Sequence, residues 1–102
     1  MTASERPDEI GVIEKAGNAF FMRLEGENIG EITFVPVEDG TWLLDHTYVD
    51  PQYRGGSIAR RLLQRVADEA RAEGVKIVPV CSYAVTQFKR DPGYSDVWKR
   101  NP

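Results

Sequence analysis

Hydrophobic and polar residues alternate through the first half of the chain, which is the pattern of strands in an antiparallel sheet. Residues 18–24 are rich in aromatic and aliphatic side chains, and in residues 29–37 Gly30, Ile32 and Phe34 alternate with Glu31, Thr33 and Val35. Turn-forming stretches, Glu-Gly-Glu-Asn and Glu-Asp-Gly, follow these two segments. The pattern predicts an antiparallel meander, and a short strand near residues 11–14 is expected to join it.

Residues 41–49 form the last strand of this predicted meander. A strict two-residue period places one set of side chains on one face: Trp42, Leu44, His46 and Tyr48. The opposite face then carries Leu43, Asp45, Thr47 and Val49. His46 is therefore expected to share a face with Trp42, which we assign to the core together with Phe20 and Phe34.

After residue 57 the hydrophobic period changes to three and four residues. The resulting stripe predicts one helix, which Gly74 is expected to end; its apolar positions are Ile58, Ala59, Leu62, Leu63, Val66, Ala67 and Ala70. Residues 75–80 are then predicted as a strand, and a strand–helix–strand order gives a right-handed crossover with parallel strands. Pro79 has no N–H for a ladder, so it is expected at an edge, at a bulge or where this strand parts from its neighbour. A short helix is expected over residues 83–90, and a final turn over residues 94–98.

The size of the chain limits it to one core. Its 102 residues, of which 41 % are hydrophobic and 28 % charged, are in the range of a single globular domain. We expect a loose N-terminal tail over residues 1–8, one α/β (α+β) domain with a mixed sheet over residues 9–98, and a frayed C-terminus over residues 99–102.

Charge and cysteine content exclude several classes of protein. The net charge of −3 argues against a nucleic-acid-binding domain, although Arg54, Arg60, Arg61 and Arg65 form a cluster that fits a local anionic ligand. No apolar run is long enough to span a bilayer, and no membrane partner is expected. One cysteine and one histidine supply neither an internal disulfide nor a thiolate–imidazole zinc site, so we expect no metal and a cytoplasmic location.

The stretch from Asp50 to Ala59 leaves a predicted strand and opens the predicted helix. Glycines at Gly55 and Gly56 allow close approach of a ligand, and the N–H groups of the first helical turn favour an anion. Arg54 adds a bidentate donor at the rim. Taken alone, this pattern leaves two interpretations open, a phosphate site and a plain tight turn.

The stretch resembles the central motif of the GNAT superfamily of acyl-CoA N-acyltransferases, Arg/Gln-x-x-Gly-x-Gly/Ala. Arg54, Ile58 and Ala59 match it in register, and Ser57 stands where the motif has a glycine. The Ser57 hydroxyl is expected to cap the helix or to contact phosphate. Three further stretches are similar to the small single-domain YjdJ-like branch of that family: His46-Thr47-Tyr48-Val49, residues 77–82 and residues 90–94. Together these similarities cover residues 9 to 98.

The resemblance implies an N-acyltransferase whose co-substrate is acetyl-CoA / coenzyme A. It also implies that the strands over residues 41–49 and 75–80 start parallel and then splay apart. Pantetheine would pair with the backbone of Thr47, Tyr48 and Val49. The pyrophosphate would lie at Arg54, Gly55, Gly56, Ser57, Ile58, Ala59 and Arg60. The acceptor site is expected to be open and shallow, and to take a small amine, a polyamine or a peptide amine. A monomer or weak dimer is expected.

Three residues are candidates for the chemistry, each with a plainer alternative. His46 titrates in the useful range for a base, or is a structural histidine within the sheet. Cys81 accepts the acyl group as a thiolate, or is a small buried hydrophobe. Tyr83 protonates the departing thiolate, or only packs. The main alternative function is a non-catalytic acyl-CoA sensor or protein-interaction module.

Overall fold

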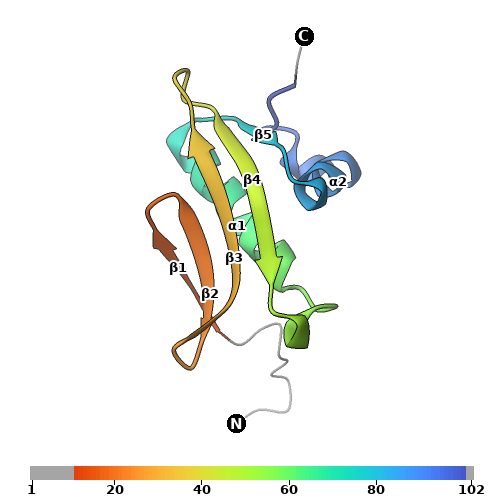
Figure 1. Ribbon diagram of the computed structural model, residues 1–102. Coiled ribbons are helices and arrows are strands. Elements are labelled where there is room, and N and C mark those ends of the chain that lie inside the picture. The colour runs from red at the N-terminus through yellow and green to blue at the C-terminus, as the bar shows by residue number, and fades with distance from the viewer. Residues whose placement is uncertain (1–10, 101–102) are drawn as a thin grey trace.

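The computed structural model describes residues 11–100, and Figure 1 shows a mixed sheet with one long and one short helix. The tail predicted over residues 1–8 lies outside the described residues. The strands are β1 (Val12–Ala16), β2 (Ala19–Leu24), β3 (Glu27–Pro36), β4 (Trp42–Val49) and β5 (Ile77–Pro79). They lie in the order β1-β2-β3-β4-β5, with β1 to β4 antiparallel and β5 parallel to β4. This arrangement confirms the predicted α+β fold with a mixed sheet.

Helix α1 (Ile58–Glu73) lies across one face of the sheet (Figure 1). Its apolar stripe is buried as predicted except at Ala59, which is half-buried, and Gly74 ends the helix in a left-handed conformation with φ of 73°. The stripe packs on buried side chains of the strands, which are Phe20, Met22, Ile32, Phe34, Trp42 and Leu44. At Gly30 the helix lies close to the sheet, since a Cβ there would stand 3.0 Å from Ile58 Cγ2.

A register shift between β3 and β4 changes which side chains of β4 face α1. Thr33 pairs with His46 and Phe34 pairs with Leu44, so Asp45 bulges between them. The alternation that Trp42 and Leu44 begin is therefore reversed after Asp45. The prediction that His46 shares the face of Trp42 is wrong: His46 and Tyr48 are exposed on the outer face, and Thr47 turns inward.

Strands β4 and β5 part soon after they meet, as the family resemblance implied. Their parallel pairing ends at Leu44 and Pro79. The N–H groups of Val80 and Cys81 both donate to the Leu44 carbonyl, at 2.9 and 3.1 Å. Within residues 11–100 no strand pairs with residues 45–49 on the β5 side of β4. A free backbone edge therefore opens where the strands splay.

The rest of the chain closes the other side of β5. Helix α2 (Ser82–Arg90) and a 3-10 turn, η3 (Pro92–Tyr94), follow β5 and lead to a parallel bridge between Trp98 and Ile77. The Lys99 N–H donates to the Ile77 carbonyl at 2.8 Å. Ordered pairing therefore reaches one residue into the segment that was expected to fray. In the part of the chain that the structure covers, no helix combines the length and apolar character needed to cross a membrane.

Candidate functional site

Residues 50–57 carry the chain from the end of β4 to the first turn of α1. A 3-10 turn, η2 (Pro51–Tyr53), starts this connection, and the Asp50 carboxylate fixes it by accepting the Gln52 N–H at 2.9 Å. Gly55 has φ of 93°, a conformation that glycine adopts without strain. Ser57 is the N-cap residue of α1, and its carbonyl accepts the Arg61 N–H at 2.8 Å. The turn thus sets the helix N-terminus beside the free edge of β4.

The N-terminus of α1 is suited to an anion. The N–H groups of a first helical turn have no acceptor within the helix, and the helix dipole adds partial positive charge there. The first turn of α1 contains no acidic residue. The Ser57 side chain makes no capping hydrogen bond, so the expected capping role is not realised. Backbone N–H groups and nearby arginines therefore supply the anion-binding character.

A groove joins this turn to the splayed strands. It consists of two adjoining pockets, of about 190 and 260 Å³. Both are lined by the same four residues, Val49, Arg54, Ala59 and Tyr83. The pocket at the turn adds Tyr53, Gly55, Gly56 and Ile58, and the pocket along β4 adds Thr47 and Tyr48. The groove thus brings together eight of the ten residues that the sequence assigned to the coenzyme.

The two remaining residues lie at its margin. Ser57 is buried at the start of α1. Arg60 follows Ala59 and lines a different pocket, on the side of α1 that faces away from the sheet. Tyr53 was not predicted as a site residue, although its place inside the glycine turn was a signal that could have found it.

Arg54 is held against the edge of β4. Its Nε donates to the Val49 carbonyl at 2.8 Å, and its guanidinium carbon lies 5.8 Å from the centre of the Tyr48 ring. These contacts hold the Arg54 guanidinium group where the two pockets meet. In this position Arg54 can bind an anion seated on the turn.

Tyr83 lies in the first turn of α2 and faces both pockets. Burial raises the pKa of its phenol above the ordinary value, and the nearby Arg60 charge works against this rise. The phenol therefore carries its proton at neutral pH. A protonated hydroxyl in the groove is able to act as a hydrogen-bond donor or a general acid.

Cys81 lies at the point where β5 ends. Its Sγ is 3.4 Å from the Thr47 Oγ1, and either atom is able to donate. The side chain is half-buried and α2 begins immediately after it. Because Thr47 also lines the groove, Cys81 is placed beside the groove wall, on the α1 side of β4.

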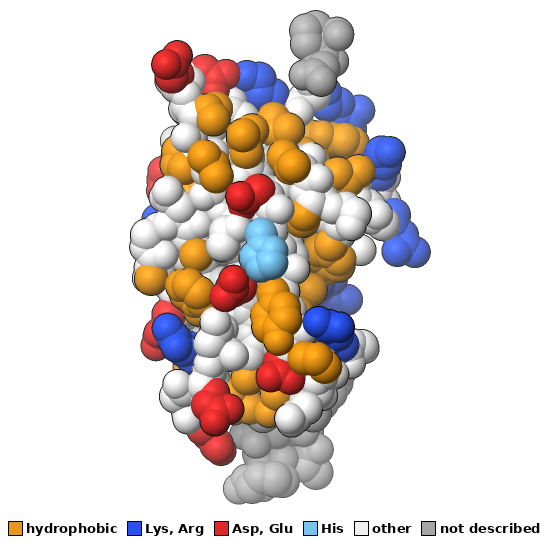
Figure 2. Space-filling model, in the orientation of Figure 1, with side chains coloured by type: hydrophobic (Ala, Val, Ile, Leu, Met, Phe, Trp, Pro, Cys, Tyr) orange, Lys and Arg blue, Asp and Glu red, His pale blue; other side chains and the backbone are white. Residues whose placement is uncertain are grey.

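His46 is on the opposite face of the sheet. Figure 2 views this outer face, where the single histidine lies between acidic side chains. Its Nε2 is 3.4 Å from Glu31 Oε2 on the neighbouring strand. About half of its side chain, 51 %, is exposed. His46 and Cys81 therefore do not form a contacting pair. His46 lies on the outer face of the sheet, and Cys81 lies on the face that α1 covers.

No group of three or more His, Cys, Asp or Glu side chains among residues 11–100 is arranged to hold a metal ion.

Comparison with known proteins agrees with this fold. A family model described as GCN5-related N-acetyl-transferase matches residues 19–97. The chain belongs to the GCN5-related N-acetyltransferase (GNAT) family. Its placement in the YjdJ-like branch stays a prediction.

Individual relatives differ in how much of them the chain matches. A GCN5-like protein from Staphylococcus aureus, solved by NMR, is 28 % identical with a TM-score of 0.74, over 89 % of this chain and 90 % of that one. A ribosomal-protein-alanine N-acetyltransferase from Brucella melitensis biovar Abortus 2308 is 31 % identical with a TM-score of 0.52, over 61 % of this chain and 48 % of that one. The IAA acetyltransferase of Azospirillum brasilense is 36 % identical over 66 residues, which are 61 % of this chain. The matched region spans only 43 % of that curated relative.

Proposed function

We propose that this domain transfers an acetyl group from acetyl-CoA to an amine acceptor. The observation that carries the proposal is the groove that runs from the free edge of β4, at Thr47 to Val49, to the N-terminus of α1. Pantetheine amides are able to pair with unused backbone groups of a strand edge. The pyrophosphate at the end of that arm requires N–H donors and positive charge, which the glycine turn and Arg54 offer.

The chemistry that we propose uses both faces of the sheet. Cys81 first loses its proton to solvent, its thiolate attacks the thioester carbonyl, and the C–S bond to coenzyme A breaks. Tyr83 gives its proton to the departing thiolate and regains one from solvent. The acceptor amine then attacks acetyl-Cys81 from the outer face, the C–S bond to Cys81 breaks to restore the thiolate, and His46 takes the proton that the amine loses. The N-terminus of α2 stabilises negative charge at Cys81.

The acceptor class that we propose is a cationic amine, such as a polyamine or a peptide lysine. The outer face around His46 carries Glu31 and Asp45, and the whole chain has a net charge of −3. The named activities of the relatives differ in acceptor, so they support acetyl transfer without selecting one acceptor.

Calorimetric titration with acetyl-CoA and with coenzyme A tests the first half of this proposal. We expect saturable binding of both, and about tenfold weaker binding by Arg54→Ala, because one charge-assisted contact to phosphate is lost. Arg23→Ala is the matched control, since Arg23 pairs with Glu14 away from the groove. If neither ligand binds to the native protein, the proposed function is wrong.

A panel of amines, followed by release of free coenzyme A thiol, tests the second half. We expect turnover with a cationic amine, and a lower kcat with an unchanged coenzyme affinity for His46→Gln, since His46 lies outside the groove. The separation of His46 from Cys81 favours one other candidate, a non-catalytic acyl-CoA-binding module. Intact binding without turnover on the whole panel would select that module.

A further inference from the structure

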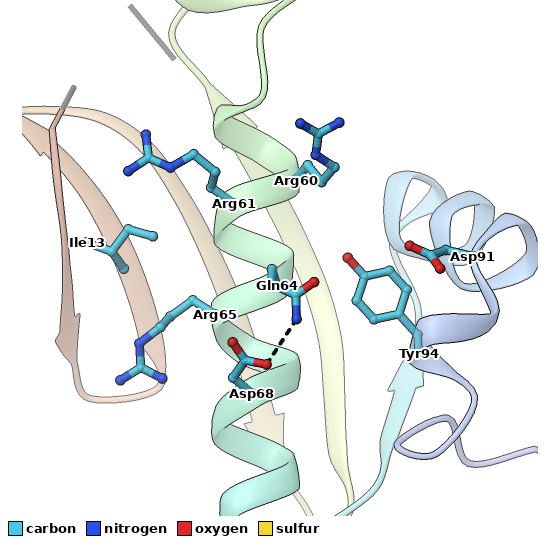
Figure 3. A pocket seen from close by; sticks show the side chains of 8 residues that line it. All are labelled: Ile13, Arg60, Arg61, Gln64, Arg65, Asp68, Asp91 and Tyr94. Carbon is cyan, nitrogen blue, oxygen red and sulfur yellow. Dashed lines mark hydrogen bonds between the residues drawn. The ribbon is translucent and has the colours of Figure 1, made fainter. Parts of the chain in front are cut away.

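A second groove, of about 340 Å³, lies over the solvent side of α1 (Figure 3). Its lining residues are Ile13, Arg60, Arg61, Gln64, Arg65, Asp68, Asp91 and Tyr94. Figure 3 shows that Arg60 and Gln64 lie on the side of α1 that faces Tyr94 and Asp91. Arg61 and Arg65 lie on the side that faces Ile13. Arg60, which lines this second groove, directly follows Ala59, which lines both pockets of the groove assigned to the coenzyme.

Arg60 carries a positive charge that no carboxylate of residues 11–100 neutralises by an ion pair. Other arginines of α1 have such partners: Arg65 Nη1 lies 2.7 Å from Glu69, and Arg71 Nε lies 2.6 Å from Asp96. Arg60 is exposed, and its charge lowers the pKa of both Tyr83 and Tyr94 against the rise that burial causes. An available cation thus lies near two phenols, that of Tyr83 in the coenzyme groove and that of Tyr94 in the second groove.

The two carboxylates of this second groove are already engaged. Asp68 Oδ1 accepts Gln64 Nε2 at 2.9 Å and Arg71 Nη1 at 3.0 Å. Asp91 Oδ1 accepts the Gly93 N–H at 2.8 Å and so caps η3. Three arginines and two carboxylates line the groove, and the Asp68 charge is paired with Arg71, so the positive charge of the lining exceeds its negative charge.

We propose that Arg60 binds the 3′-phosphate of coenzyme A, and that the second groove, between Arg60 and Tyr94, receives the nucleotide end of the molecule. This inference rests on the proposed function, because the pyrophosphate must first lie on the turn before Ala59. From there the ribose is only a few bonds away, and Arg60 is the next side chain along α1. A phosphate monoester is a dianion with oxygens that a guanidinium binds in a bidentate manner.

Lys89 and Arg90 offer a rival phosphate site at the end of α2. Both are exposed, and neither lines the coenzyme groove or the second groove. Arg90→Gln is therefore both the matched control for Arg60→Gln and the test of the rival site.

The test compares coenzyme A with dephospho-coenzyme A, which lacks only the 3′-phosphate, by calorimetric titration. We expect the native protein to bind coenzyme A about tenfold more tightly, which corresponds to one charge-assisted contact. Arg60→Gln should bind both ligands within about twofold of each other, and Arg90→Gln should keep the full preference. Added salt should reduce the preference of the native protein, because exposed charges are screened.

Three results would overturn the inference: equal binding of both ligands by the native protein, a full preference in Arg60→Gln, or a preference that only Arg90→Gln removes. None of these three results contradicts the proposed function, because coenzyme A still binds in each case. Failure of the native protein to bind either ligand would instead overturn the proposed function, and the inference with it. Thermal unfolding followed by circular dichroism shows that each variant is folded before it is titrated.

Discussion

Thr47 Oγ1 and Cys81 Sγ lie 3.4 Å apart, across the gap that opens where β4 continues beyond the end of β5. The contact exists because Asp45 bulges. Without the bulge, Thr47 would point to the outer face, as the strict strand alternation predicted. The hydroxyl thus ties the start of α2 to the strand whose backbone edge lines the groove.

Cys81 and its partner give the first prediction. After incubation with acetyl-CoA, intact-protein mass spectrometry should detect one acetyl group on the native protein and none on Cys81→Ala. Thr47→Val removes the hydroxyl but keeps the shape, so the labelling should slow several-fold while coenzyme A affinity stays within about twofold. If the native protein is never labelled and Cys81→Ala turns over normally, Cys81 is only part of the groove wall and transfer is direct.

The glycine turn gives the second prediction. Gly55→Ala should destabilise the fold by about 1–2 kcal/mol, because φ of 93° is strained for any residue with a Cβ. It should also weaken coenzyme A binding at least several-fold, since relief of the strain rotates the N–H groups of the turn.

Gly17→Ala is the matched control for this variant. Gly17 also has positive φ, 58°, in the hairpin between β1 and β2, and an added Cβ would be in open space at both positions. We expect a comparable loss in the urea midpoint and no loss of coenzyme affinity. Equal binding losses in both variants would show that the effect comes from general destabilisation.

The parts of the fold that could be predicted are those that local sequence determines. The apolar stripe of α1, its glycine stop and the turn before it each depend on neighbouring residues. The parting of the strands was one of three placements that the sequence left open for Pro79, and the structure selects it. The bulge at Asp45 could not be derived from periodicity, because the pairing with β3 decides it. Aspartate is uncommon inside strands, and its presence at this position was the one local signal.

For the candidate site, too, the features that depend on neighbouring residues were predictable and those that depend on distant segments were not. The groove residues that follow one another along the chain from Arg54 to Ala59 were predicted, and only Ser57 of that run lies outside the groove. Contacts between distant segments were not: Glu31 beside His46 and Arg60 beside Tyr94 depend on strand register and on the path of the C-terminal segment. Sequence periodicity contains no information on either.

Gly30 gives the third prediction, on how closely α1 packs on β3. In Gly30→Ala the new methyl group would stand 3.0 Å from Ile58 Cγ2 and 3.3 Å from Leu62 Cδ1. Ile58 and Leu62 are both buried and have no free space to move into. We therefore expect overpacking to lower the free energy of unfolding by about 1–2 kcal/mol. Because Ile58 is the first residue of α1, the displaced helix end should also weaken coenzyme A binding. The double variant Gly30→Ala, Ile58→Leu removes the Cγ2 branch at nearly constant side-chain volume, so it should recover part of the stability; failure to do so would contradict this account.

Glu69 gives the fourth prediction, on acid stability. Hydrogen bonds from Lys15 of β1 and from Arg65 lower the pKa of this carboxyl from 4.5 to about 2. A carboxyl with a lowered pKa in the folded state stabilises the protein fully above its unfolded pKa, and this stabilisation is lost as pH falls. Native protein should therefore be more stable than Glu69→Gln above about pH 4.5, and the two urea midpoints should converge as pH falls towards about 2.

Glu73→Gln is the control for this pH series, because Glu73 lies 3.9 Å from the same Lys15 but is more exposed, at 47 %. We expect little difference from the native protein at any pH. Asp39 and Asp96, whose pKa values are also lowered by their basic partners, are present in all three proteins and cancel in the comparison. A gap between native protein and Glu69→Gln that stays constant down to about pH 2 would show that Glu69 contributes by packing alone. Convergence would show instead that its charge joins the edge strand β1 to α1.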